Sequence, residues 1–272
     1  MGKRTVFFLS DRTGITVEML GNSLLSQFDG IDFHRVHIPF LDSEEKLAEA
    51  IARIEKAGEI ERHPPLVFST LVESGLRDQL EHSPCHLIDL FEHFIPDLEQ
   101  ELGRPSGRAV GRTHGIGNLA EYERRVDSMH YSLSHDDGAK LTNLGKAEVI
   151  LIGVSRSGKT PTCLYLSLHY GLFAANYPLI PEDLEQHRLP EALRPHKERL
   201  FGLTLQPERL HQIRQARRGG SDYAALDTCR REIRQAESLF AREGIPMINS
   251  SSLSIEEIAT EILRRLKLKG HR

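Results

Sequence analysis

The chain has 272 residues, of which 39% are hydrophobic and 27% are charged, and its formal net charge is -4. This composition is typical of a globular protein and excludes a disordered chain, and the absence of a basic excess argues against a nucleic-acid partner. No run approaches the ~20 apolar residues of a membrane span, so no membrane partner is expected. Only three cysteines are present (Cys85, Cys163 and Cys229), which favours a reducing compartment. We therefore expect a cytoplasmic protein.

The first hundred residues alternate between strand and helix patterns. Short β-branched and aromatic runs predict strands at 5–10, 33–38 and 65–71, and apolar residues at helical spacing predict helices at 15–28, 43–58 and 84–102. Ser43 is expected to cap the second helix and Gly58 to end it. Pro96 is expected to interrupt or restart the third helix. The alternation predicts an N-terminal α/β domain with a parallel sheet, residues 1–102.

Residues 103–118 form the best linker candidate, because they contain five glycines and one proline and have no apolar period. With the helix predicted at 120–135, they make up a linker and bridging helix, residues 103–145. Further strand patterns follow at 146–155, 173–180, 200–205 and 245–250, and helix patterns at 160–171, 207–218, 223–243 and 254–266. The sequence thus predicts a second α/β domain, residues 146–272.

The segment GVSRSGKT fits the phosphate-loop (P-loop) pattern G-x-x-x-x-G-K-[ST] and lies between the strand and the helix that such a loop requires. All eight residues are predicted to bind nucleotide: Gly153, Val154, Ser155, Arg156, Ser157, Gly158, Lys159 and Thr160. The glycines let successive N–H groups turn toward phosphate oxygens. Lys159 supplies positive charge as a catalytic residue, and the Thr160 hydroxyl is the predicted ligand of Mg²⁺.

A chance match in a glycine-rich turn is the alternative interpretation of this segment, and the flanking strand and helix disfavour it. We therefore expect the C-terminal domain to be a P-loop kinase-like α/β domain.

P-loop proteins usually hold Mg²⁺ with a second carboxylate at the end of a neighbouring strand, and no strand pattern here ends in that way. The nearest acidic pair is Asp136 and Asp137, in SHDDG, upstream of Gly153. Both are predicted catalytic residues, as a metal ligand or as the base for a hydroxyl nucleophile. The alternative is a polar helix end closed by Gly138. His135 beside the pair is a candidate proton shuttle, or else a cation at a helix C-terminus.

Two further segments have both a functional and a structural interpretation. SDRTG, residues 10–14, follows a strand and precedes a helix, where Arg12 and free N–H groups could bind a phosphate in open α/β sheets, although a plain turn capped by Ser10 or Asp11 is the simpler interpretation. The helix at 207–218 carries four arginines, Arg209, Arg214, Arg217 and Arg218. They could close over a transferring phosphate, but a solvated helix face is the simpler interpretation.

Six segments occur in a fixed order along the chain: FFLSDRTGITVE, HDDG, ILIGVSRSGKTPT, AANYPLIPEDL, FGLTLQPERLHQIRQARR and IPMINSSSLSIEEIATEIL. Together they resemble the bifunctional regulatory proteins of phosphoenolpyruvate synthase and of pyruvate, phosphate dikinase, and the resemblance extends from about residue 5 to residue 266. The segment INSSSLS resembles the branch that acts on phosphoenolpyruvate synthase.

The resemblance implies a protein kinase that uses ADP as phosphoryl donor and inactivates its target by phosphorylating a threonine beside the catalytic histidine. It also implies the reversal of this modification by phosphorolysis, in which inorganic phosphate takes the phosphoryl group and leaves as pyrophosphate. Two other functions fit the residues: an ATP-dependent kinase of a small metabolite, and a nucleotide sensor without catalysis. A homodimer is expected only from the frequency of symmetric pairs.

Overall fold

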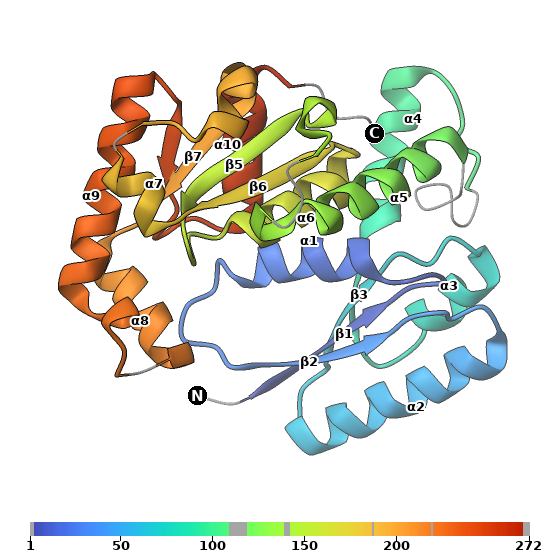
Figure 1. Cartoon of the computed structure of the whole chain (residues 1–272). Coiled ribbons are helices and arrows are strands. Elements are labelled where there is room, and N and C mark those ends of the chain that lie inside the picture. The colour runs from blue at the N-terminus through green and yellow to red at the C-terminus, as the bar shows by residue number, and fades with distance from the viewer. Residues whose placement is uncertain (1–2, 109–118, 139–141, 187, 219, 269–272) are drawn as a thin grey trace. The chain divides into compact units, whose positions relative to one another are not determined.

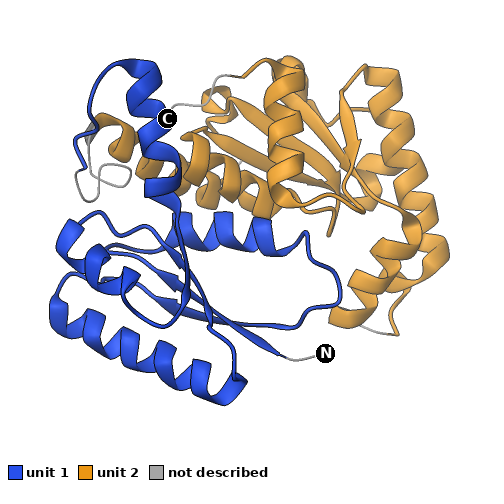
Figure 2. Ribbon diagram, turned by 180° about the vertical axis from the view of Figure 1, so that it is seen from behind, with its two compact units in different colours: residues 1–117 blue, residues 118–272 orange. Residues whose placement is uncertain are grey.

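In the computed structural model of the chain, residues 1–117 and 118–272 form two compact units, which Figure 2 shows in separate colours. Each unit contains a four-stranded parallel sheet, which confirms the predicted α/β class. The structure describes residues 3–108, 119–138, 142–186, 188–218 and 220–268. Most of the predicted linker, residues 109–118, lies outside the described residues. Within the described part, no helix is both long and apolar enough to cross a membrane.

Unit 1 is a parallel sheet covered by helices on both faces (Figure 1). Its strands are β1 Arg4–Leu9, β2 Phe33–Ile38, β3 Leu66–Ser69 and β4 His86–Asp89, in the order β2-β1-β3-β4. Its helices are α1 Ile15–Leu25, α2 Glu44–Glu61, α3 Ser74–Glu81 and α4 Leu90–Leu102. Helices α2 and α3 pack on one face around Phe7 and Val67, and α1 and α4 contribute to the core around Phe8 and Phe68 on the other.

The prediction that Gly58 ends the second helix is wrong. Helix α2 continues to Glu61 and ends at Arg62, which adopts a left-handed conformation with φ 55°. A glycine inside a helix costs only about 1 kcal/mol, which tertiary contacts can offset. At Gly58 the chain packs closely on Pro65, because a Cβ placed there would lie 3.2 Å from the proline ring.

The segment predicted as one helix at 84–102 contains strand β4 followed by helix α4, and Pro96 lies inside α4 without ending it. The strand was missed because a run of four residues is too short for apolar spacing to distinguish strand from helix. The Asp89 carboxylate caps α4 by accepting hydrogen bonds from the backbone N–H groups of Phe91 and Glu92. This cap stabilises the first turn ahead of the proline. Helix α3 was also not predicted.

Unit 2 repeats the plan of unit 1, a parallel sheet with helices on both faces (Figure 1). Its strands are β5 Val149–Val154, β6 Ala174–Leu179, β7 Leu200–Thr204 and β8 Met247–Asn249, in the order β6-β5-β7-β8. Its helices are α5 Leu119–Ser134, α6 Lys159–Tyr170, α7 Pro181–Glu185, α8 Pro207–Arg218, α9 Leu226–Glu243 and α10 Ile255–Leu266. Helices α6 and α10 cover one face of the sheet, and α9 covers the other. Every residue of β5 is buried between β6 and β7.

Helix α1 packs closely on its sheet at Gly21, where there is no side chain to hold the helix away. A Cβ at this position would lie 2.4 Å from the Phe8 ring, which is buried and stacked on Phe68 with the ring centroids 5.6 Å apart. The clash in Gly21→Ala should therefore lower the free energy of unfolding by about 1–3 kcal/mol. The higher helix propensity of alanine should offset about 1 kcal/mol of this loss. The midpoint of urea unfolding measures this change.

The control for this prediction is Gly75→Ala on α3, where an added Cβ meets no atom within 4 Å. That variant should unfold at the same or a higher urea concentration than the unmodified chain. Equal midpoints for Gly21→Ala and Gly75→Ala would show that α1 has room to move away from Phe8.

Candidate functional site

The P-loop segment forms the tight turn between β5 and α6 that its pattern requires. Gly153 passes so close to β7 that an added Cβ would lie 2.3 Å from the Leu203 carbonyl oxygen, which only glycine permits. Gly158 adopts a left-handed conformation with φ 92° immediately before α6, and Arg156 does the same with φ 77°. The turn therefore lies at the carboxyl end of a buried central strand and at the N-terminus of a helix, where backbone N–H groups favour anions.

Lys159 is buried beneath this turn, with 4% of its surface exposed. Its Nζ donates to the Val154 carbonyl oxygen at 2.9 Å, the one hydrogen-bond acceptor that the described residues provide. Burial lowers the pKa of Lys159 to about 8, although the negative charges of Asp137 and Asp136 act in the opposite direction. A phosphate in the turn would supply a further negative charge and stabilise the ammonium.

Asp136 lies against the start of α6. The Thr160 hydroxyl donates to the Asp136 carboxylate at 2.7 Å, and the Asn176 side-chain amide donates to the same oxygen. Asn176 is buried on β6, and its own side-chain oxygen accepts from the backbone N–H of Asp137 at 3.0 Å. The structure thus brings the acidic pair, which precedes β5 in the chain, to the end of the P-loop.

Helix α5 explains how the acidic pair reaches this place. The Ser128 hydroxyl donates to the Ser167 carbonyl of α6 at 3.1 Å, and the Ser132 hydroxyl donates to the Ala174 carbonyl of β6 at 2.6 Å. These buried contacts fix α5 against α6 and β6. Asp136 follows directly after the helix and is therefore held at the carboxyl edge of the sheet.

The two acidic residues differ in their surroundings. Asp136 is half-buried and hydrogen-bonded, whereas Asp137 is exposed and adopts a left-handed conformation with φ 49°. Asp137 is nevertheless the largest of the charges that favour protonation of Lys159. Asp136 is therefore held in place by its neighbours, whereas the Asp137 carboxylate is accessible to solvent.

Thr160 and Asp136 together fit a magnesium site. Both present oxygen atoms, the ligands that Mg²⁺ prefers, and they are already within 2.7 Å of each other. No group of three or more His, Cys, Asp and Glu side chains converges among the described residues. That finding is compatible with Mg²⁺, which keeps several waters and takes few protein ligands. A bound Mg²⁺ would neutralise charge on nucleotide phosphates.

His135 does not support the proton-shuttle hypothesis. Its ring is buried and stacked on Tyr131, with the ring centroids 3.9 Å apart. Nε2 lies 2.8 Å from the Thr142 carbonyl oxygen, and Nδ1 lies 2.9 Å from the Tyr131 carbonyl oxygen. The ring therefore fixes the chain after α5, and neither nitrogen is directed at Asp136.

The interpretation of the α8 arginines as a solvated face is wrong for Arg214, whose side chain is 1% exposed. Its Nη2 donates to the Ser155 carbonyl of the P-loop at 3.2 Å and to Glu232 at 2.7 Å, and its Nη1 donates to the Tyr223 carbonyl at 2.9 Å. Its guanidinium also lies 4.0 Å from the centre of the Tyr223 ring. Arg217 is exposed as predicted, and the Arg218 side chain is outside the described residues. Arg214 thus supports the loop through its hydrogen bond to the Ser155 carbonyl, and this contact is called the brace below.

Three other residues of this site were not found from the sequence. The Tyr223 hydroxyl donates to the Ser155 hydroxyl at 3.0 Å, and the Ser250 hydroxyl donates to the Ser157 carbonyl at 3.2 Å. Asn176 had a usable signal, because it is an amide inside a buried parallel strand, where apolar residues are the norm.

The SDRTG segment, residues 10–14, lines a pocket of unit 1.

Comparison with known proteins places these observations in a family. The sequence profile of the kinase/pyrophosphorylase family matches residues 6–263. A protein of Marinobacter nauticus is 50% identical over 270 residues, which cover 99% of this chain and 100% of that protein. Proteins of Hahella chejuensis and Legionella pneumophila are 48% and 49% identical, over 99% and 96% of both chains. All three carry the name "Putative phosphoenolpyruvate synthase regulatory protein".

The match covers nearly the whole chain and includes the P-loop, the acidic pair and the helices that hold them together. The similarity to the three relatives is also continuous over both units. The chain therefore belongs to the kinase/pyrophosphorylase family.

Proposed function

We propose that this protein is a bifunctional regulator of phosphoenolpyruvate synthase. It phosphorylates a threonine of that enzyme with ADP as donor, and it removes the phosphoryl group by phosphorolysis. The hydrogen bond between Thr160 and Asp136 is the observation that carries the proposal, because it brings a carboxylate to the hydroxyl that is expected to bind Mg²⁺, although no described strand of unit 2 ends in such a carboxylate. The names of the relatives support the choice of target enzyme.

The site residues have distinct roles in the proposed reaction. The backbone N–H groups from Ser155 to Gly158 bind the phosphates of ADP, and Lys159 neutralises the moving phosphoryl group. Asp136 and Thr160 would hold Mg²⁺. Asp137 takes the proton from the threonine hydroxyl as its oxygen attacks the β-phosphorus of ADP, so that AMP leaves. In the reverse modification, an oxygen of inorganic phosphate attacks the phosphorus of the phosphothreonine. The threonine oxygen is the leaving group and regains its proton, and pyrophosphate is released.

Two alternatives share the same site. The protein could act on pyruvate, phosphate dikinase, since the resemblance covers the regulators of both enzymes. It could also be an ATP-dependent kinase of a small metabolite. Nucleotide preference and the need for a protein substrate distinguish these functions.

The direct test is a transfer assay with purified phosphoenolpyruvate synthase whose catalytic histidine is phosphorylated. With ADP labelled in the β-phosphate, label should appear on a threonine of the synthase, and added phosphate should release it as labelled pyrophosphate. Parallel reactions contain the dikinase, or ATP with small hydroxyl metabolites. Label on the dikinase alone would change the target, and ATP consumption without a protein substrate would replace the proposal with metabolite kinase activity.

The acidic pair can be tested with single isosteric substitutions. Asp136→Asn should lower both activities, because the amide cannot supply the charge that a metal at Thr160 requires. Asp137→Asn should lower the kinase rate about 10²–10⁴-fold, the usual contribution of a general base. Initial rates in each direction measure both effects. Asp127→Asn, an exposed carboxylate on α5, is the control and should keep full activity. Full activity of both Asp136→Asn and Asp137→Asn would contradict the assigned roles.

The brace formed by Arg214 can be tested with lysine, which keeps the charge near Glu232 but lacks the forked guanidinium. Arg214→Lys should bind ADP about tenfold more weakly, because it loses a charge-assisted hydrogen bond to the Ser155 carbonyl. Calorimetric titration with ADP measures this change. Arg217→Lys, on an exposed position of the same helix, should bind ADP normally. Unchanged affinity in Arg214→Lys would show that the loop keeps its shape without the brace.

A further inference from the structure

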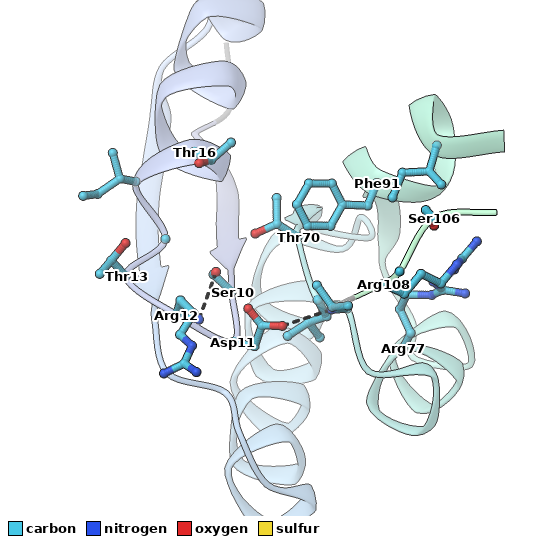
Figure 3. Close-up of a pocket in the computed structure, with 16 residues that line it drawn as sticks. Ser10, Asp11, Arg12, Thr13, Thr16, Thr70, Arg77, Phe91, Ser106 and Arg108 are labelled. Atoms are coloured by element: carbon cyan, nitrogen blue, oxygen red, sulfur yellow. Dashed lines mark hydrogen bonds between the residues drawn. The ribbon is translucent and has the colours of Figure 1, made fainter. Parts of the chain in front are cut away.

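Unit 1 contains a pocket of about 320 Å³ at the carboxyl edge of its sheet (Figure 3). One wall comes from residues 10–16, which follow β1, and another comes from residues 70–72, which follow β3. Strands β1 and β3 are neighbours in the sheet, but the chain runs from β1 to β2 on one side and from β3 to β4 on the other. In open α/β sheets, ligands bind in the crevice at this reversal of strand order.

Hydroxyl groups form the polar side of this pocket: Ser10, Thr13, Thr16 and Thr70. Thr70 is 4% exposed, and no described residue hydrogen-bonds to its hydroxyl. In Figure 3 the Thr70 oxygen lies on the side of Ser10, whereas the Ser10 and Asp11 oxygens already accept hydrogen bonds from the backbone N–H groups of Arg12 and Val72. Because this hydroxyl lines the pocket and has no partner among the described residues, it is free to donate a hydrogen bond to a ligand or to water.

The N-terminus of α1 adds donors to the same wall. The helix has 11 residues and begins after Gly14, whose left-handed conformation with φ 77° provides no side-chain cap. No described residue accepts a hydrogen bond from the backbone N–H of Ile15 or Thr16, and both residues line the pocket. Free N–H groups at the start of a helix favour a negatively charged group.

The lining of this pocket includes one carboxylate, Asp11, and three arginines, Arg12, Arg77 and Arg108. Asp11 accepts a hydrogen bond from the Val72 backbone N–H at 3.1 Å, and burial raises the pKa of its carboxyl group. Arg77 and Arg108 line the pocket but both bind Glu92, so part of their charge is already neutralised. The arrangement therefore suits one phosphate group better than a chain of phosphates.

The rest of the wall is apolar and is formed by Ile15, Leu71, Val72, Phe91 and Ile95. A free phosphate ion would gain nothing from this surface, whereas an organic group attached to phosphate would bury apolar area against it. We propose that this pocket binds a phosphate group carried on an organic stem, with the phosphate at Thr70 and the start of α1. The proposal concerns unit 1 alone and stands whether or not unit 2 transfers phosphate.

The test uses nuclear magnetic resonance of the full-length, ¹⁵N-labelled protein, because amide shifts report the two units separately. The probe is a capped phosphothreonine, and the comparison ligands are the same compound without phosphate and inorganic phosphate. The phosphothreonine should shift the amide signals of Ile15 and Thr16 in a saturable way and at lower concentration than inorganic phosphate. Shifts confined to Gly158 and Thr160 would overturn the proposal, and so would equal affinity for the unphosphorylated compound. Equal affinity for inorganic phosphate would overturn recognition of the stem.

Substitutions at the pocket provide the second part of the test. Thr70→Val should weaken phosphothreonine binding about tenfold through loss of one hydrogen bond to a charged group, and Thr70→Ser should restore it. Asp11→Asn should bind about threefold to tenfold more tightly, because it removes a negative charge near the phosphate. The controls are Thr260→Val and Asp78→Asn, which remove a hydroxyl and a carboxylate outside the pocket. Unchanged binding in Thr70→Val, or weaker binding in Asp11→Asn, would contradict a phosphate at this position.

Discussion

The hydrogen bond from Thr160 to Asp136 is the constraint on which the unit 2 site depends. It joins the start of α6 to the chain after α5, and Asn176 of β6 binds the same carboxylate. Three segments that are apart in sequence are thus fixed to one another at the carboxyl edge of one sheet. If α5 did not pack on α6 through Ser128, Asp136 would have no fixed position relative to the loop. The docking of α5 is therefore part of the candidate site.

Buried charge is the second feature of unit 2. Lys159 and Arg214 are both almost fully buried, yet only Arg214 has a carboxylate partner at hydrogen-bond distance, Glu232. A buried cation without a close counter-charge is costly, and an anionic ligand relieves that cost. Arg214 is instead neutralised by Glu232 and hydrogen-bonded to the Ser155 carbonyl, so it supports the loop. In the proposed function, Lys159 is therefore the cation that binds the ligand.

Much of this fold could be predicted from the sequence, because long apolar periods and strong strand runs determine most elements. The predictions failed where local patterns are short or ambiguous, as at β4 and α3. The turn between β5 and α6 could also be predicted, since its glycine pattern is local. The partners of the loop could not, because Arg214, Asn176 and Ser250 reach it through tertiary packing. A solvated arginine and a buried one look the same in a sequence, and only the position of Glu232 on a neighbouring helix distinguishes them.

The two units share one strand order, since β2-β1-β3-β4 and β6-β5-β7-β8 are the same arrangement. In each unit the turn after the first strand of the sheet leads into a helix with a left-handed glycine before it, Gly14 or Gly158. The sheet therefore offers the same anion-binding edge twice, and the side chains decide what binds there. In the proposed function, the buried lysine and nearby carboxylate of unit 2 bind a nucleoside diphosphate with Mg²⁺. Hydroxyl groups, arginines already paired with Glu92 and an apolar wall suit a single phosphate ester in unit 1.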